Sequence, residues 1–147
     1  MVLNVKVINS SAVVPCRMTE QAAGYDIAVL EDCVFEAGDT SVKMCRTGVA
    51  IEVAEYSGQD FAIMVYARSS LCKKGLILAN GVGVIDADYR GEIHVPLINV
   101  SGKRVVLEKG TRVAQLVIQS LHTPPVRVVE TLGDTVRGCG GFGSTGA

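Results

Sequence analysis

The stretch Glu92-Ile-His-Val-Pro-Leu97 decides the fold class, because apolar residues occupy every second position. Successive side chains of an extended chain point to opposite faces, so this period of two indicates a strand with one buried face. The same period recurs in residues 3–7 and 49–53, and the continuously apolar run 61–66 is typical of a strand buried on both faces. A mainly β fold is therefore expected.

Turn signals separate these strands at spacings that suit antiparallel sheets, in Glu36-Ala-Gly-Asp39, Ser101-Gly102 and Lys109-Gly110. One place favours a helix: Ser69 or Ser70 is expected to cap a short segment that runs through Lys74 and ends at Gly75. The predicted architecture is a jelly-roll-like, distorted β-barrel with one short helix.

Length and composition predict one domain. The chain has 147 residues, of which 48% are hydrophobic and 20% charged, and 14 basic minus 15 acidic residues give a net charge of −1. Such a balance predicts neither stable nucleic-acid binding nor membrane attraction. The sequence has no basic-then-apolar leader and no run of eighteen apolar residues, so a cytoplasmic protein is expected, or one of the host cytoplasm or nucleus if the source is viral.

Cysteine and histidine usage argues against a zinc site. The 5 cysteines are an odd number without Cys-x-x-Cys spacing, which is typical of free thiols in a reducing compartment. His94 and His122 have no partner at ligand spacing, so both are interpreted as structural or surface histidines.

The last fifteen residues form a glycine-rich tail, with six of the 16 glycines of the chain. Glycine lets a backbone approach a ligand closely, Arg137 can bind phosphate through two N–H groups, and Phe142 offers a flat face to a base. Two interpretations stay open from this segment alone, a lid over a nucleotide and an unstructured Gly/Ser end. The expected division is a core over residues 1–132 and an arm over residues 133–147.

The strongest concentration of chemistry lies between Asn80 and Glu92. Two apolar residues lead into Asp86-Ala-Asp88-Tyr89, and an extended backbone would place both carboxylates on one side and Tyr89 on the other. Neighbouring carboxylates raise each other's pKa, or they share a cation or an arginine. The alternative is a solvated hairpin tip with a local ion pair.

Two weaker signals accompany it. Arg68-Ser69-Ser70 stands at the expected helix start, where backbone N–H groups and a guanidinium favour phosphate, although the same residues suit a simple cap or a phosphorylation site. Gln115 interrupts an apolar strand. It is either a core amide with satisfied hydrogen bonds or an inward-facing contact to a ligand, and the residue alone favours the first interpretation.

Five segments, at 23–27, 68–71, 83–91, 112–116 and 137–146, resemble in order the five motifs of the trimeric deoxyuridine triphosphatase (dUTP pyrophosphatase) family. The resemblance implies a homotrimer with shared active sites that the C-terminal arm closes. It implies hydrolysis of dUTP to dUMP and pyrophosphate by an activated water at the α-phosphorus, which limits uracil in DNA and supplies dUMP for dTMP synthesis. It also implies Mg²⁺ held by the triphosphate and water, without a direct protein ligand.

By the same resemblance, Asp86 would hold and deprotonate the water, and Tyr89 would stack under the deoxyribose and reject a ribose 2′-hydroxyl. Asn80 and the backbone of Gly83, Val84 and Ile85 would read the uracil. Phosphate contacts would come from Arg68, Ser69, Ser70 and Gln115. The arm would add substrate contacts from Arg137, Phe142, Gly143, Ser144 and Thr145, with Phe142 over the uracil. Asp26 and Asp88 are expected to be structural or supporting groups.

The sequence departs from the commonest family pattern at Ala67 and Ser70, so the phosphate loop is expected to differ in stiffness, and oxidation of Cys139 could block closure of the arm. Two alternatives remain. The first is a dCTP deaminase-like enzyme of the same fold, for which Glu92 is the only nearby glutamate. The second is a regulatory binding protein switched by nucleotide.

Overall fold

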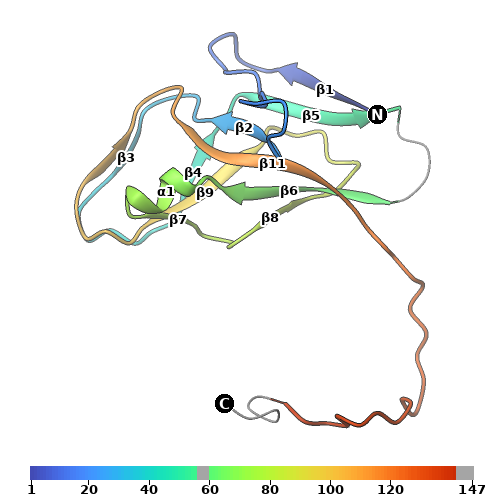
Figure 1. Cartoon of the computed structure of the whole chain (residues 1–147). Coiled ribbons are helices and arrows are strands. Elements are labelled where there is room, and N and C mark those ends of the chain that lie inside the picture. The colour runs from blue at the N-terminus through green and yellow to red at the C-terminus, as the bar shows by residue number, and fades with distance from the viewer. Residues whose placement is uncertain (56–59, 142–147) are drawn as a thin grey trace.

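The structure is a computed structural model that describes residues 1–55 and 60–141, and this part of the chain is mainly β with one short helix (Figure 1). The elements are β1 (Val2–Val7), β2 (Tyr25–Ala28), β3 (Cys33–Phe35), β4 (Lys43–Arg46), β5 (Val49–Ala54), β6 (Phe61–Ala67), α1 (Ser69–Lys73), β7 (Leu76–Leu78), β8 (Gly83–Ile85), β9 (His94–Asn99), β10 (Val105–Leu107) and β11 (Arg112–Ser120). The predicted mainly β class with one short helix is confirmed.

The strands pair antiparallel in four sheets. The largest has the order β2-β11-β6-β8, a second has the order β4-β9-β7, and β1-β5 and β10-β3 form two-stranded sheets. Within the described residues these sheets do not join into one closed barrel, so the predicted barrel is corrected to an open arrangement of sheets. Four of the strands span only three residues each.

The sheets share one hydrophobic core. In β9 the predicted alternation of residues 92–97 is confirmed, because Val95 and Leu97 are both 0% exposed while His94 is exposed. Burying a side chain such as Leu97 stabilises the fold by about 1.5–3 kcal/mol. In β5 the alternation is incomplete, since Ala50 is buried between Val49 and Ile51. The small Ala50 side chain leaves the second face of this strand able to pack as well.

The helix α1 begins one residue earlier than expected. Its N-cap is Arg68, which is still extended and whose backbone N–H donates to the Val113 carbonyl oxygen of β11 at 3.1 Å. No side-chain cap is present at this N-cap, so the expected Ser69 or Ser70 cap is wrong: both serines already lie inside the first turn. The stop at Gly75 is confirmed, because its φ of +70° suits glycine and a Cβ there would lie 2.3 Å from Ser101 Cβ.

The expected turns are present. The Asp39 N–H donates to the Glu36 carbonyl at 3.3 Å, and the Thr111 N–H donates to the Glu108 carbonyl across Lys109-Gly110 at 2.9 Å. The Ser101 N–H donates to the Asn99 side chain at 3.0 Å, beside Gly102. Local turn chemistry in the sequence therefore predicts where this chain reverses.

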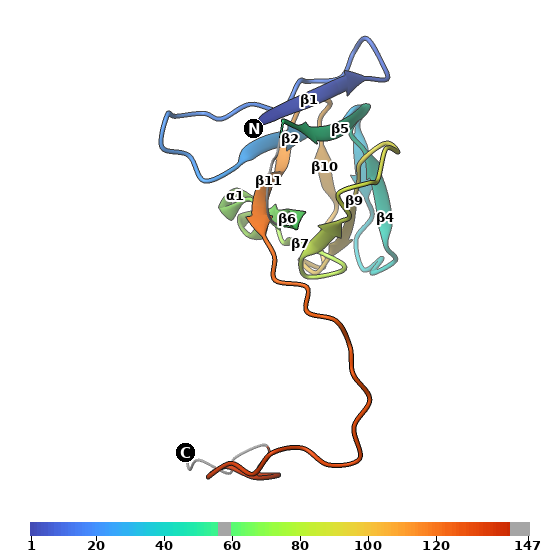
Figure 2. The same ribbon diagram turned by 90° about the vertical axis from the view of Figure 1, so that its right-hand side faces the viewer.

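Beyond β11 the chain leaves the body. Residues 121–141 contain no helix or strand and run away from the sheets as an extended tail (Figures 1 and 2). The departure point at Leu121 precedes the expected start of the arm at residue 133, and the division into core and arm stays a prediction. The described residues contain no helix with the length and hydropathy needed to span a membrane.

Candidate active site

A cavity of about 300 Å³ lies beside β8 and the loop that follows it. Its walls come from the turn before β8, from β8 itself, from residues 86–94, and from β4, β6 and β9. Six of the predicted site residues line it: Asn80, Gly83, Val84, Ile85, Asp86 and Tyr89. Six further residues were not predicted to line it: Met44, Val65, Glu92, Ile93, His94 and Pro96.

The strand β8 forms one wall and is an edge strand. It pairs with β6 through Ile63↔Ile85 and Val65↔Gly83, and in the described sheet it has no partner on its other side. A Cβ at Gly83 would lie 2.9 Å from Val65 Cβ, so glycine allows the two strands to approach this closely. An unpaired strand edge presents backbone N–H and C=O groups, which can pair with the polar edge of a flat ring.

Asp86 begins a turn instead of continuing the strand. The Tyr89 N–H donates to the Asp86 carbonyl at 3.1 Å, so Asp86 and Asp88 do not share one side of an extended chain as the sequence analysis expected. Arg90 adds to this turn, because its Nη1 donates to the Ala87 carbonyl at 2.8 Å and to the Tyr89 carbonyl at 3.0 Å. Asp86 lines the cavity, and Asp88 is not among its lining residues.

The Tyr89 ring is held over Gly91. A Cβ at Gly91 would lie 2.3 Å from Tyr89 Oη and 2.6 Å from Cζ, so any larger residue would displace the ring. The Tyr89 hydroxyl donates to the Glu92 carbonyl at 3.1 Å. The ring is thereby fixed at the cavity wall, in reach of a ligand.

Glu92 has a partner that sequence reasoning missed. Arg46 Nη2 lies 3.0 Å from Glu92 Oε2, and the Gly48 N–H donates to Glu92 Oε1 at 2.8 Å. The hydrogen bond from Arg46 holds the pKa of Glu92 below its ordinary value, and His94 contributes in the same direction. Because Arg46 is 46 positions away, no local sequence signal could have found the pair.

A second cluster forms where β2, β11 and the end of β6 meet. Arg68 Nε lies 3.2 Å from Asp26 Oδ2, and Arg112 Nε lies 3.7 Å from the same oxygen. This oxygen is buried and forms no hydrogen bond with either guanidinium, so it meets both as ion pairs alone. Gln115 is paired with Asp26 across the β2–β11 ladder. The cluster is rich in phosphate-binding groups, and it adds Arg112 to the predicted set.

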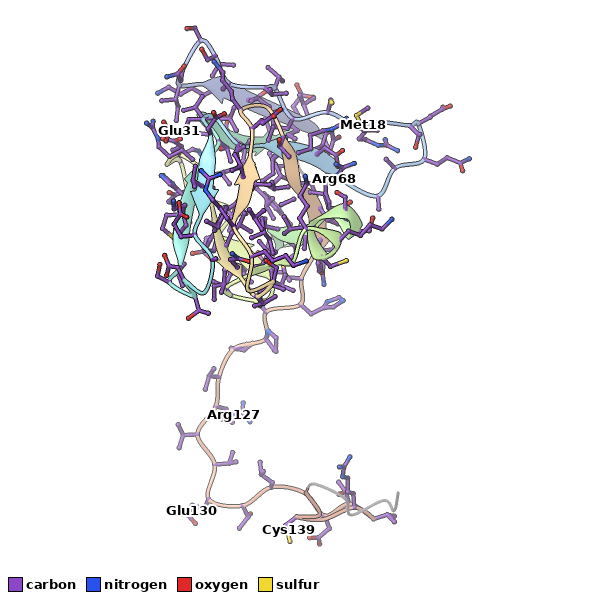
Figure 3. The ribbon with its side chains drawn as sticks, turned by 90° about the vertical axis from the view of Figure 1, so that its left-hand side faces the viewer. Met18, Glu31, Arg68, Arg127, Glu130 and Cys139 are labelled. Carbon is purple, nitrogen blue, oxygen red and sulfur yellow. The ribbon has the colours of Figure 1, made fainter. Side chains whose placement is uncertain are left out.

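Ser69 and Ser70 follow Arg68 in the chain and open α1, and Figure 3 shows Arg68 beside this helix. Of the arm residues, Arg137 lies on the extended tail, where its Nε donates to the Gly140 carbonyl at 3.0 Å. Phe142, Gly143, Ser144 and Thr145 lie outside the described residues.

The two clusters lie apart on one chain. Asp86 follows Ile85, which pairs with Ile63 near the start of β6, while Arg68 follows the last residue of the same strand. Six residues of β6 lie between Asp86 and Arg68 along the strand. At about 3.3 Å per residue, they separate the two positions by roughly 20 Å in the strand direction. Asp86 and Arg68 of the same chain are therefore too far apart to contact the same phosphate group.

A mainly β fold has a cavity with a carboxylate at its wall and, apart from it, a cluster of arginines and serines, an arrangement suited to a flat, phosphate-bearing ligand. The dUTPase family model matches residues 10–146, and the chain belongs to the dUTPase family. It is 41% identical over 147 residues to the deoxyuridine 5′-triphosphate nucleotidohydrolase of Nautilia profundicola, with 99% of both chains covered.

Other relatives agree. The enzyme of the same name from Paramecium bursaria Chlorella virus 1 is 45% identical and matches over 98% of this chain and 97% of its own length. Among solved structures, the dUTPase of Staphylococcus bacteriophage 80alpha with dUPNHPP superposes with a TM-score of 0.85 at 28% identity, over 99% of each chain. The family resemblance drawn from the five motifs is thus confirmed.

Proposed function

We propose that this protein hydrolyses dUTP to dUMP and pyrophosphate. One observation carries the proposal: Asp86, Asn80, the edge of β8 and Tyr89 surround a single cavity. The names of the relatives support the same substrate. The product dUMP would feed dTMP synthesis, and removal of dUTP would limit uracil in DNA.

Base recognition falls to Asn80 and β8. The edge of uracil carries both donors and acceptors, as a peptide backbone does, so the free edge of β8 can pair with it while the Asn80 amide completes the pattern. The methyl group of thymine would have to enter the space beside the strand. Cytosine would place hydrogen-bond donors against donors of the protein, so it would pair poorly. Tyr89 would lie under the deoxyribose and exclude a 2′-hydroxyl.

Asp86 is proposed to hold the attacking water and take its proton. A positioned general base typically contributes about 10²–10⁴ in rate. The remaining acceleration is assigned to groups that stabilise negative charge on the phosphate oxygens, namely Arg68, Ser69, Ser70 and Gln115. Asp88 lies outside the cavity lining and is proposed to support the turn.

The residues of the second cluster fit Mg²⁺ carried by the triphosphate. Asp26 Oδ2, buried without a hydrogen bond, would be able to accept a hydrogen bond from a water molecule bound to that ion. The ion would neutralise the charge of the triphosphate. Asp26 would in turn keep Arg68 in place through its ion pair at 3.2 Å.

The separation of the two clusters supports active sites shared between copies of the chain, as in a homotrimer. The sheet β4-β9-β7 and its surroundings also expose large apolar side chains that another copy could cover: Val42 (52%), Met44 (56%), Ile77 (44%), Val84 (64%) and Val100 (56%). The tail exposes Val126, Val128 and Leu132 almost fully, which suits a segment that packs on a neighbour and brings Arg137 and the residues after it over the site.

The deaminase alternative needs a free acid or base near the ring. Glu92 lines the cavity, but its two carboxylate oxygens are engaged by Arg46 and Gly48, and its lowered pKa keeps it ionised. This arrangement favours a structural task for Glu92 over proton transfer. The regulatory alternative stays a hypothesis without a specific contact in its favour.

A pyrophosphate assay across dUTP, UTP, dTTP and dCTP, with and without Mg²⁺, tests the proposal. We expect release from dUTP that depends on Mg²⁺, and loss of roughly 10²-fold or more in Asp86→Asn with dUTP binding retained. Ammonia release from dCTP would indicate the deaminase, and unchanged turnover in Asp86→Asn would reject the role of Asp86.

A further inference from the structure

Arg46 binds Glu92 through both carboxylate oxygens. Arg46 Nη2 lies 3.0 Å from Oε2, and Nε lies 3.2 Å from Oε1 and 3.3 Å from Oε2. The Glu92 side chain is 13% exposed and that of Arg46 is 43% exposed. The pair therefore joins a nearly buried carboxylate to a guanidinium that solvent still reaches.

The Arg46–Glu92 junction, the place where this ion pair joins the two segments, has further hydrogen bonds beside it. Glu92 Oε1 also accepts the Gly48 N–H at 2.8 Å. The next residue, Ile93, accepts the Thr47 hydroxyl at 2.7 Å and donates its N–H to the Val49 carbonyl at 2.9 Å. The end of the loop formed by residues 86–92 is thus tied to the turn between β4 and β5.

The same junction reaches the cavity. The Glu92 carbonyl accepts the Tyr89 hydroxyl at 3.1 Å, and Tyr89 in turn donates its N–H to the Asp86 carbonyl at 3.1 Å. A continuous series of contacts runs from Arg46 through Glu92 to Tyr89 and Asp86. Arg46 itself is not among the residues that line the cavity.

We propose that Arg46 is a positioning residue for the reaction, which through Glu92 fixes the 86–92 loop and so the places of Tyr89 and Asp86. This inference rests on the proposed dUTP hydrolysis. A second ion pair on the loop, Arg90 with Glu52 at 3.2 Å, has both side chains largely exposed at 52% and 44%, and exposed pairs hold geometry weakly.

Loss of Arg46 would disturb the loop because the Glu92 carboxylate would lose its ion-pair partner. Glu92 would keep its charge with one remaining hydrogen-bond donor, the Gly48 N–H, in a nearly buried place. An unpaired charge is costly to keep out of water, so the loop is expected to shift until Glu92 is hydrated. A shift of about 1 Å at a reacting group can lower the rate by about 10²-fold.

The test compares Arg46→Ala and Arg46→Lys with a matched control, Arg104→Ala. Arg104 lies 3.5 Å from Glu36 in another Arg–Glu pair, exposed at 58% and 64%, outside the cavity lining. With kinetics measured well below each unfolding temperature, we expect Arg46→Ala to lower kcat/KM for dUTP by about 10- to 100-fold and to reduce the preference for dUTP over UTP. Arg46→Lys should recover part of both, and Arg104→Ala should match the wild type.

Hydrogen exchange gives a readout that does not need turnover. Amides of residues 86–93 should exchange faster in Arg46→Ala and not in Arg104→Ala. If Glu92 carries the effect, Arg46→Ala combined with Glu92→Gln should be no slower in catalysis than the worse single variant.

Two failures can be told apart. If the wild type hydrolyses dUTP while Arg46→Ala retains wild-type kcat, dUTP preference and exchange, the positioning role is wrong. If the wild type releases no pyrophosphate from dUTP, the proposed function is wrong, and exchange at residues 86–93 still decides whether Arg46 holds the loop.

Discussion

Two carboxylates of one short loop have different surroundings and so different tasks. Asp86 lines the cavity at the end of β8, where its side chain can meet a ligand. Glu92 is bound by Arg46 and by the Gly48 N–H, which favours its ionised form. This contrast supports the proposal that Asp86 acts on the ligand while Glu92 anchors the loop.

Acid should loosen this anchor. Because the pKa of Glu92 is lowered in the fold, its contribution to stability is complete above the unfolded pKa and is lost as pH falls through the folded one. We expect the difference in urea midpoint between the wild type and Glu92→Gln to be constant above about pH 5 and to shrink below about pH 4. A difference that grew on acidification would contradict the assignment.

Substitution of Tyr89 should change sugar selection. Removing the ring in Tyr89→Ala frees the space proposed to exclude a 2′-hydroxyl, and the preference for dUTP over UTP should fall about tenfold or more. Steady-state kcat/KM for both nucleotides measures it. Tyr89→Phe is the control, since it keeps the ring and removes the hydroxyl that bonds Glu92; equal loss in both variants would assign selection to the hydroxyl instead.

The 5 thiols should fall into two groups. Cys16, Cys72 and Cys139 are exposed, while Cys33 and Cys45 are buried, and burial raises the pKa of Cys45 so that its reactive thiolate is scarce. Titration with an aromatic disulfide reagent should find three fast thiols in the native protein and five after denaturation. Cys72→Ser should lower the fast count to two; five fast thiols in the native state would contradict the packing.

At the scale of the element, β8 combines a task in the sheet with one at the ligand. Its inner edge pairs with β6 and its outer edge faces the cavity side. The close approach at Gly83 links the two, because moving β8 away from β6 would move the backbone proposed to read uracil.

Gly83→Ala tests this link. The added Cβ would stand 2.9 Å from Val65 Cβ, an atom next to the backbone, so the strand must shift. We expect a loss of about 1–3 kcal/mol in unfolding free energy and a higher KM for dUTP. Gly133→Ala is the control, since a Cβ there meets nothing within 4 Å. Wild-type stability and KM in Gly83→Ala would mean that β8 tolerates displacement.

At the scale of the molecule, the proposed site would be incomplete on one chain. Residues 68 and 86 are close in sequence, but along the direction of β6 they lie roughly 20 Å apart. If copies share sites, Asp86→Asn and Arg68→Ala should each be nearly inactive alone and should complement each other after mild dissociation and mixing. Random reassortment would restore about a quarter of wild-type activity, because each site then draws its Asp86 and Arg68 from different subunits. Light scattering before and after mixing checks the assembly, and a mixture without activity would indicate sites within single chains.

The sequence by itself determined most of the strands, the main turns and half of the residues around the cavity. Alternation in residues 92–97 sets which side chains can be buried together, and Gly75 ends the helix through its own backbone preference. These are short-range effects, so a local pattern contains the information.

Only the tertiary structure decided the partners. The Arg46–Glu92 pair joins residues 46 positions apart, and Asp26 meets Arg68 and Arg112 because three strands converge. The turn at Asp86 is local, since the Tyr89 N–H donates to the Asp86 carbonyl, and it was missed because the extended pattern was continued past Ile85. The pairs that Arg46 and Asp26 form depend instead on how sheets pack and on strand register, and both follow from the whole core acting together.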